Sequence, residues 1–320
     1  MLKREKTSSY NEVKKRKNSS FERAQARAFY VIMIPFVLFL LITKGYPIAW
    51  RLYISLTNFT GYNLNDLLFV GFDNFKRVFT DTEAIPSIIR VLGIGIISVP
   101  CSLIISISLS LLLSRQRKGT GIFRTLIYLP ALVPTIATAI MWRGIYNYHG
   151  GLFNAIGGFL GIEPVNWLGY EYVKAAVIIM ILWASTGGIL IKIAAIKAIP
   201  EDLFEAAHIE GAGPFTRTFK ITLPMISNML YMNILTSIIA IFQLFGQVVL
   251  LAGQTSSGAD SLTAVPIRPV YTYMVHVYQQ IFVNMRFGYG MAMVWVIFAV
   301  IMIVTGIMEY TKKFWVYKEV

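Results

Sequence analysis

The sequence predicts an all-α polytopic membrane protein with six transmembrane helices. Of its 320 residues, 56% are hydrophobic and only 14% are charged, whereas about a quarter of the residues in soluble domains carry a charge. The apolar residues are gathered in blocks, and a helix needs about 20 mostly apolar residues to cross a bilayer. Six blocks reach or approach this length, at residues 28–43, 88–113, 123–142, 173–191, 225–251 and 288–308.

The first block is the shortest, and residues 46–56 continue it as a more amphipathic extension. A cleavable signal peptide is the alternative for this block. It fits poorly, because 27 polar and basic residues precede the block and no small-residue cleavage site follows it. We therefore predict a membrane-spanning helix here.

The basic residues indicate the orientation of the helices. Nine of the 29 Lys and Arg residues lie within 1–27, and further groups follow at 115–124, 192–220 and 312–318. This is the positive-inside pattern, which places both termini and the even-numbered connections in the cytoplasm. The net charge of +13 therefore indicates topology, and no nucleic-acid partner is expected.

The predicted parts of the chain are a basic cytoplasmic segment 1–27, a six-helix membrane domain 28–308 with a cytoplasmic loop 200–224, and a cytoplasmic tail 309–320.

The charges of the spans disfavour ion-coupled transport. Ion-coupled carriers generally need Asp, Glu, His or Arg deep in the bilayer. Here Arg90, Arg143 and Lys192 lie at the ends of predicted spans, where long side chains reach the interface. The fifth and sixth spans contain ionisable groups only at their margins. The sequence therefore predicts that neither protons nor sodium drive this protein.

The sequence also lacks the motifs of an enzyme. It has no His-Glu-x-x-His helix and no Gly-x-Ser-x-Gly elbow, so no catalytic residue is assigned. His149, His208 and His276 are far apart in predicted loops, and Cys101 is the single cysteine. Solvated or locally bonded histidines are the expectation, and no metal site is assigned. No phosphate-binding loop occurs either, so the energy for any uphill transport must come from another chain.

One connection, the loop 200–224, is predicted to form two short helices that need another surface to pack on. Pro200 suits the start of a helix, and Glu201 favours its positive N-terminal end. Gly211 permits a sharp turn, and Pro214 can open a second short helix. A helix this short needs a surface to pack on. That surface is either a partner protein or the lipid head groups, and the amphipathic pattern does not decide between them.

The loop resembles the EAA loop of binding-protein-dependent ABC permeases. The resemblance rests on Glu205-Ala206-Ala207, Gly211 four residues later, and then Phe219, Ile221 and Leu223-Pro224. Glu210 stands where that family usually has Asp, which keeps the charge. Residues 71–75, Gly-Phe-Asp-Asn-Phe, resemble an outer-loop motif of the same family. Residues 129–134, Leu-Pro-Ala-Leu-Val-Pro, and 151–154, Gly-Leu-Phe-Asn, resemble its sugar-type, maltose-channel branch.

The resemblance implies the type I ABC importer permease fold, in a bacterial cytoplasmic membrane. It further implies two ATP-binding subunits that bind ATP and Mg, an extracytoplasmic solute-binding protein, and a second permease, expected to be a different chain. No cofactor is expected in this chain itself. The residues implied to contact the ATPase are Glu205, Ala206, Ala207, Gly211 and Ala212.

The resemblance also implies a solute path through the middle spans. Alignment to the maltose-channel pattern places Thr135, Ser185 and Ser237 at solute-contacting positions. It places Ile241 and Leu244 where that channel uses asparagines, so the maltose site is not preserved. From adjacent helix positions, Gln243 and Gln247 are expected to replace those contacts. Hydrogen bonding between helices is the alternative role for each of these polar side chains.

The cargo is the least defined part of the prediction. An oligosaccharide is the leading expectation, and an acidic oligomer of the alginate type is the finer one. Trp183 and Phe242 are candidates for stacking on sugar rings, with packing between helices as their alternative role. Arg143, Arg268 and Arg286 near the outer side would attract an acidic saccharide, although arginines also anchor helix ends. A permease for another solute, such as a phosphodiester or polyamine, and a membrane scaffold protein are the alternatives.

Overall fold

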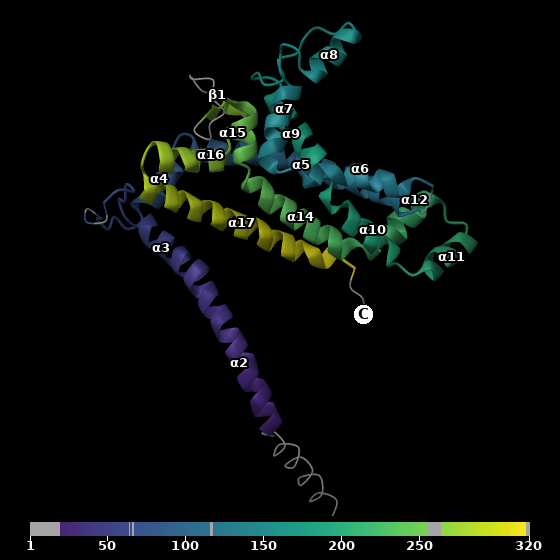
Figure 1. The fold of residues 1–320 in the computed structure, drawn as a ribbon, viewed down its shortest axis with the longest axis horizontal. Helices are drawn as coiled ribbons and strands as arrows, with labels where there is room; N and C mark the ends of the chain where they lie inside the picture. Colours follow the sequence, from purple (N-terminus) through teal and green to yellow (C-terminus); the bar gives the residue numbers. More distant parts are fainter. Residues whose placement is uncertain (1–19, 64, 66, 116–117, 255–263, 318–320) are drawn as a thin grey trace, which may run out of the picture. The chain divides into compact units, whose positions relative to one another are not determined.

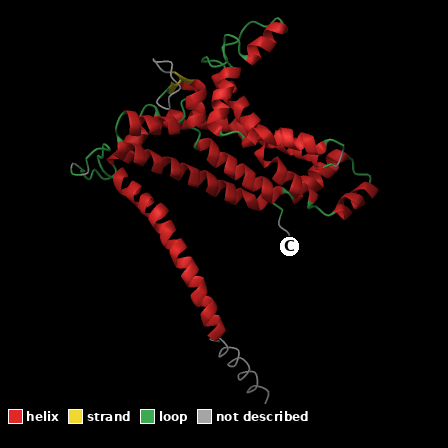
Figure 2. Cartoon of the chain, in the orientation of Figure 1, coloured by secondary structure: helices red, strands yellow, loops and turns green. Residues whose placement is uncertain are grey.

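The computed structural model describes residues 20–63, 65, 67–115, 118–254 and 264–317. Almost all of its regular structure is helical (Figures 1 and 2). The elements are α2 (Ser20–Leu40), η1 (Leu41–Gly45), α3 (Tyr46–Ser55), α4 (Asp73–Thr80), α5 (Ala84–Ser114), α6 (Thr120–Leu132), α7 (Thr135–Ile145), α8 (Leu152–Phe159), α9 (Val173–Ala184), η2 (Ser185–Gly188), α10 (Ile189–Lys197), α11 (Glu201–Ile209), α12 (Pro214–Arg217), η3 (Thr218–Thr222), α13 (Leu223–Met225), α14 (Ser227–Phe242), α15 (Gly246–Ala252), β1 (Gly253–Gln254), β2 (Val265–Pro266), η4 (Arg268–Val270), α16 (Tyr273–Tyr278), η5 (Gln279–Val283) and α17 (Phe287–Trp315).

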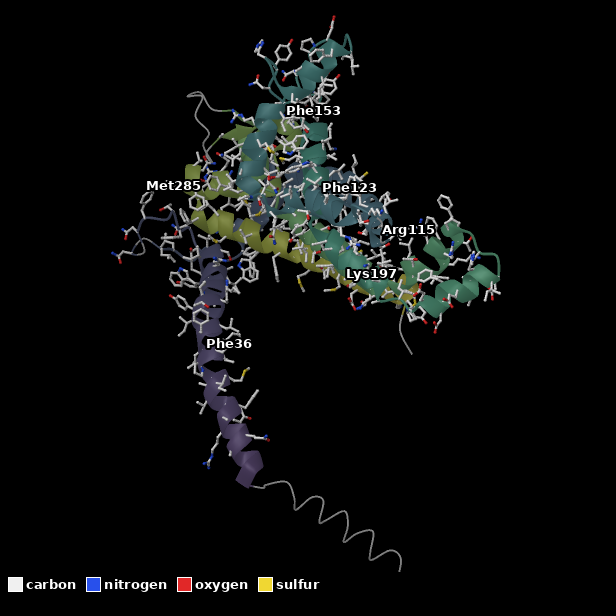
Figure 3. All side chains as sticks on the ribbon, turned by 45° about the vertical axis from the view of Figure 1, so that its right-hand side comes forward. Phe36, Arg115, Phe123, Phe153, Lys197 and Met285 are labelled. Carbon is white, nitrogen blue, oxygen red and sulfur yellow. The ribbon has the colours of Figure 1, made fainter. Side chains whose placement is uncertain are left out.

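The chain divides into two units, Met1–Ile54 and Ser55–Val320. In the first, α2, η1 and α3 form one apolar helix, which qualifies as a membrane span over Ala24–Ser55. The predicted amphipathic extension is therefore part of the same helix. Side chains such as Phe36 project from this helix (Figure 3), and Ile32 is 72% exposed. A helix that is apolar all round needs lipid or another protein around it.

The second unit contains three more helices that are long and apolar enough to cross a membrane: Ala84–Ser114, Val173–Lys197 and Phe287–Trp315. Two helix pairs reach span length only together, and each is bent at a break, by 99° between α6 and α7 and by 71° between α13 and α14. The described residues thus hold four spans, or up to six if each bent pair crosses as one. The prediction of a helical membrane protein is confirmed, and the number of six transmembrane helices stays a prediction.

The break between α6 and α7 follows from proline chemistry. Val133 is extended, with ψ of 126°, and it precedes Pro134. A residue before proline is pushed out of the helical region by contact with the proline ring. The predicted span 123–142 is therefore interrupted near its middle.

The prediction of one continuous block over 225–251 is wrong. Helix α14 ends at Phe242, Phe245 has φ −137° and ψ −81°, and α15 begins at Gly246. The hydroxyl of Thr272 donates to the carbonyl of Leu244 at 2.7 Å, which satisfies a backbone group in the break. Gln243 and Gln247 consequently lie on different helices.

Helix α5 is the centre of the second unit. It contacts α9, α10, α14 and α16, and α14 runs beside α17 (Figure 1). The largest core cluster joins α5, α9, α14, α16 and α17 with α15, and its buried members include Ile94, Val177, Phe242, Tyr273 and Met293, whereas α10 packs in two smaller clusters. The helices are held by apolar packing among themselves, while many of their other apolar side chains are exposed.

Lys192 differs from its expected position at a solvated span end. It lies within α10, and only 2% of it is exposed. Glycine 188 makes room for it, because a Cβ atom at Gly188 would lie 3.0 Å from the Lys192 ammonium. The side chain is therefore packed inside the unit.

Candidate functional site

The loop 200–224 forms a helix, a glycine turn and a second helical segment. Helix α11 begins after Pro200 and ends at Ile209, and Pro214 takes the first position of α12. Gly211 has φ of +78°, a left-handed conformation that glycine adopts without strain. The N–H of Ala212 donates to the carbonyl of Ala207 at 2.8 Å, and that of Gly211 donates to His208 at 3.0 Å. This pair of bonds is the Schellman motif that ends helices.

The loop is anchored on one side only. Phe204, Ile221 and Met225 pack on an anchor cluster made of Ile196, Ile199, Ile226 and Leu230. On the other side Ile209 is 87% exposed, and Phe215 is 80% exposed. Apolar side chains this exposed, held on a fixed helical turn, form a surface suited to a protein partner.

The five residues predicted to contact the ATPase are brought together by this turn. Glu205 and Ala206 are exposed on α11, and Ala207 is half-buried beside them. Gly211 and the half-buried Ala212 form the turn itself. A Cβ atom at Gly211 would meet nothing within 4 Å, so its backbone is open to close approach by another chain.

Four of the five predicted solute-path residues line two neighbouring hollows. The serine hollow, about 200 Å³, is lined by Ser98, Ser102, Ser185, Ser237 and Gln247 among others. The threonine hollow, about 240 Å³, is lined by Thr135, Thr138 and Gln247 among others. Gln247 lines both. Gln243 is exposed and lines neither, because the break after α14 separates it from Gln247.

Ser98 and Ser102 also line the serine hollow, but they were not among the residues predicted from the sequence. Both come from α5, whereas the predicted path used only the third to fifth spans. The hydroxyl of Ser98 is buried and has no hydrogen-bond partner among the described residues. The signal was present, because serines recur every four residues at 98, 102, 106, 110 and 114, and such a spacing keeps side chains near one face of a helix.

Some hydroxyls in the hollows are already bonded within their own helices. Ser185 donates to the carbonyl of Leu182 at 2.7 Å, and Thr138 donates to that of Pro134 at 3.2 Å. A hydroxyl oxygen bonded in this way can still accept a hydrogen bond. The hollows therefore offer both donors and acceptors to a polar solute.

The two aromatic candidates for sugar stacking serve packing instead. Phe242 is 1% exposed and belongs to the core. Trp183 meets Trp142 edge to face, with ring centroids 5.9 Å apart, in an aromatic group that includes Tyr146 and Phe153. Neither side chain lines the hollows, so the stacking prediction is not supported by their positions.

A polar cluster lies at the opposite end of α5 from the loop. This Asp81 cluster consists of Asp81, Glu83, Arg90, Arg268, Tyr271, His276 and Tyr289. Asp81 accepts hydrogen bonds from Tyr289, from His276 at 3.1 Å and from the N–H of Glu83 at 2.8 Å. Tyr271 and His276 are bonded at 2.9 Å. His276 was predicted in a loop, but it lies buried in α16.

Electrostatics in the Asp81 cluster favour the ionised carboxylate. Burial alone would raise the pKa of Asp81, but the hydrogen bonds from Tyr289, Glu83 and His276 outweigh it and lower the pKa to about 2. Burial, followed by the charges of Glu83 and Asp81, raises the pKa of Tyr271 to about 12. At neutral pH Tyr271 therefore keeps its proton near the ionised Asp81.

The arginines expected to attract acidic sugar are partly engaged. Arg268 pairs with Glu83 at 3.0 Å, and Glu83 also pairs with Arg90 at 2.9 Å. Arg143 donates to the carbonyl of Leu250 at 3.5 Å. Arg286, just before α17, is exposed. Arg268 therefore shares one carboxylate with Arg90, and its side chain is still 75% exposed.

The asparagines of two resemblance motifs have structural roles. Asn74 donates to the carbonyls of Ser55 and Thr57 at 2.9 and 2.8 Å. Asn154 exchanges hydrogen bonds with the backbone of Val165 and accepts one from the Trp167 indole at 3.2 Å. Both fix the loops that follow spans, so these motifs indicate fold and not substrate.

The long apolar helices, the loop with its exposed apolar side chains and the polar hollows are together typical of a membrane transport subunit. Comparison with known proteins agrees. Residues 98–313 match the family described as binding-protein-dependent transport system inner membrane component. The chain belongs to this family, which confirms the resemblance predicted from the loop.

The relatives and solved structures are consistent with that family. The chain is 31% identical to the probable ABC transporter permease protein YesP of Bacillus subtilis, over 95% of this chain and 96% of the relative. It is 33% identical to the trehalose/maltose transport system permease protein MalF of Thermococcus litoralis, over 76% and 83%. A chain from the crystal structure of a bacterial alginate ABC transporter, in complex with an alginate pentasaccharide-bound periplasmic protein, shares the fold, with a TM-score of 0.77, 18% identity and coverage of 91% and 96%.

Proposed function

We propose that this chain forms half of the translocation channel of an ATP-driven ABC importer for a carbohydrate. The observation that carries this proposal is the loop 200–224, a helix closed by a Schellman turn with its outer apolar side chains exposed. The relative named as a trehalose/maltose permease supports a carbohydrate cargo. An acidic oligosaccharide is the finer proposal, and it rests mainly on Arg286, because Arg268 is paired with Glu83.

The loop docks a separate ATPase in this proposal. Glu205, Ala206, Ala207, Gly211 and Ala212 form the contact, and two ATP-binding subunits hold ATP and Mg outside this chain. The loop is joined through Pro200 and the anchor cluster to α10 and α14. A displacement of the loop is therefore passed to α14, whose residues Ser237 and Ile241 line the serine hollow.

The proposed topology has six spans and both termini in the cytoplasm. Segment 1–27, loop 200–224 and tail 309–320 are cytoplasmic, and the Asp81 cluster faces outward, towards the solute-binding protein. The concentration of Lys and Arg in the cytoplasmic parts supports this orientation. A second, different permease covers exposed apolar faces of the spans and completes the channel.

The solute passes the two hollows in this proposal. Thr135, Ser185, Ser237 and Gln247 offer hydrogen bonds to sugar hydroxyls, and Ser98 and Ser102 add two more groups. Each hollow is smaller than a typical ligand pocket of at least about 300 Å³. The partner permease therefore supplies the other wall of the solute site, and rocking of the two chains opens it to either side.

Reconstituted import tests the proposal. The full complex is placed in vesicles with its binding protein, and ATP-dependent uptake of neutral and uronate oligosaccharides is measured. Glu205→Lys and Gly211→Pro should abolish uptake and release the ATPase, because one reverses a contact charge and the other destroys the Schellman turn. Glu163→Lys, an equal charge change at an exposed distant residue, should leave uptake intact. Uptake unchanged in both loop variants would contradict the docking assignment.

A further inference from the structure

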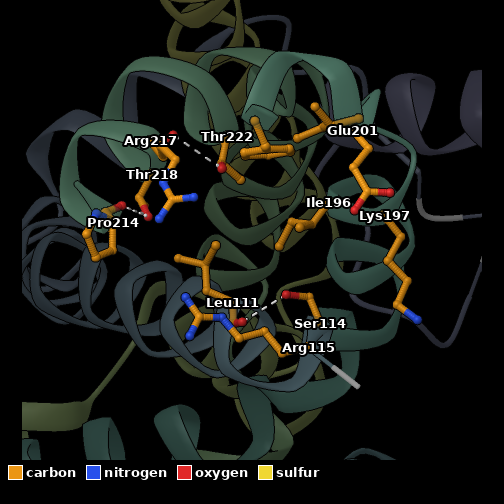
Figure 4. Close-up of a pocket in the computed structure, with 12 residues that line it drawn as sticks. Leu111, Ser114, Arg115, Ile196, Lys197, Glu201, Pro214, Arg217, Thr218 and Thr222 are labelled. Atoms are coloured by element: carbon orange, nitrogen blue, oxygen red, sulfur yellow. Dashed lines mark hydrogen bonds between the residues drawn. The ribbon is translucent and has the colours of Figure 1, made fainter. Parts of the chain in front are cut away.

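A pocket of about 500 Å³ lies between the loop and the ends of α5 and α10 (Figure 4). Its rim includes Ser114 and Lys197, which are the last residues of two candidate membrane spans. Figure 3 shows Arg115 and Lys197 at this same end of the helices. A pocket at the level where two spans end lies where the hydrocarbon core gives way to the lipid head groups.

The pocket is cationic and its cations are available. Arg115, Lys197 and Arg217 line it, against the single acidic residue Glu201. Among the residues that the structure describes, none forms a hydrogen bond or ion pair with the charged group of any of these three basic side chains. In Figure 4 both arginine side chains extend into one side of the pocket, with Lys197 and Glu201 on the other.

The same wall carries apolar groups. Leu111, Ile196 and Phe204 line the pocket together with the hydroxyls of Ser114 and Thr218. An occupant therefore meets paired guanidinium groups and hydroxyls, which suit phosphate oxygens, next to aliphatic and aromatic side chains. A free inorganic anion would contact only the guanidinium and hydroxyl groups and not the apolar side chains. An anionic phospholipid uses both.

We infer that the Arg115–Arg217 pocket binds the phosphate of an anionic phospholipid head group. The inference rests on the proposed orientation, in which this end of the helices lies at the cytoplasmic leaflet, where anionic lipids attract basic side chains. Arg115 follows α5, and Arg217 belongs to the loop. The bound phosphate therefore ties the coupling loop to the central helix of the unit.

Lipid retention by the purified complex tests this inference. The complex is assembled in phosphatidylcholine nanodiscs with increasing phosphatidylglycerol, and bound phosphatidylglycerol is counted by native mass spectrometry. Arg115→Gln with Arg217→Gln should weaken binding about thirtyfold, since each basic side chain near an anionic surface contributes roughly fivefold. Arg217→Gln alone should weaken it about fivefold. Replacement of both arginines by lysine should restore most of the binding.

The control is Lys118→Gln, which removes an exposed neighbouring charge outside the pocket lining. It should leave phosphatidylglycerol bound. A second arm offers inorganic phosphate to the complex in detergent without lipid, and weak binding is expected there. Equal retention of phosphatidylglycerol by wild type and the double variant would overturn the inference, and so would tight binding of inorganic phosphate alone. Loss of the ATPase from the double variant with lipid retention unchanged would also overturn it. Lipid binding is measured without transport, so its failure is distinct from failure of the importer proposal.

Discussion

The two ends of the central helix α5 differ in how their charges are satisfied. At the Asp81 end, two carboxylates bond two arginines and a histidine, and the Asp81–His276 and Glu83–Arg268 pairs join residues 195 and 185 positions apart. At the loop end, Arg115, Lys197 and Arg217 have no such partners among the described residues, and Ile209 and Phe215 are exposed. The first end is completed within the chain. At the second end we propose that other molecules, the ATPase and an anionic lipid, supply the missing contacts.

This difference has a physical meaning for a transport subunit. A network of charge-assisted hydrogen bonds holds several loops in one arrangement, so the Asp81 end acts as a fixed frame. An anchored loop with an exposed apolar face loses little on binding, because its shape exists beforehand. Motion transmitted from the loop can then move helices against the frame. Variants at each end should therefore have opposite effects on stability and on assembly.

The largest effect on stability is expected at the Asp81 end. Asp81→Asn removes a carboxylate that accepts from Tyr289, His276 and the backbone, and should cost about 2–3 kcal/mol. The melting temperature of the purified chain at neutral pH measures it. Glu171→Gln, at an exposed residue, is the control and should not change melting.

The same carboxylate predicts a pH dependence. Its pKa of about 2 lies below the ordinary value of 3.8, so its stabilising contribution is present above pH 4. It is lost as the pH falls from about 4 to about 2. Asp81→Asn should flatten this part of the pH–melting profile. A profile identical to that of wild type would show that Asp81 does not carry the network.

A pair of loop variants sharpens the comparison at the other end. Phe204→Ala removes a side chain packed on the anchor cluster and should lower the melting temperature, at a cost of roughly 1–2 kcal/mol for a half-buried aromatic. Ile209→Ser changes a side chain that is 87% exposed and should leave melting unchanged. It should nevertheless weaken ATPase retention in a pull-down several-fold. Destabilisation by Ile209→Ser, with retention intact, would reverse the assigned roles of the two side chains.

The apolar helices and the helix–turn–helix form of the loop could be predicted from the sequence because both depend on local patterns of residues. Hydrophobic runs marked the helices, Pro134 directly follows the kink at Val133, and Gly211 marked the turn. The break between Gln243 and Gly246 had no comparable local signal. It depends on Thr272, which satisfies the Leu244 carbonyl from 28 residues away. Gln243 was therefore assigned to a path that it does not line.

Long-range partners explain the other differences. His276 was predicted as a loop residue, and its partner Asp81 is 195 residues away. Lys192 was expected at an interface, and its burial follows from the packing space beside Gly188. Ser98 stands in a row of serines that the sequence shows, but that row does not tell which helices face it; only the hollow places α5 beside Ser185 and Ser237. In each case the partner lies far away in the chain, and a local pattern does not name it.

Site-specific photo-crosslinking tests the central claim, that the loop docks a separate ATPase. A photo-reactive amino acid is placed at Ala206, and in a second variant at the exposed residue Glu163, in the complete complex. Illumination should yield an adduct with the ATP-binding subunit from position 206 and none from position 163. An ATPase adduct from position 163, with none from position 206, would contradict the account.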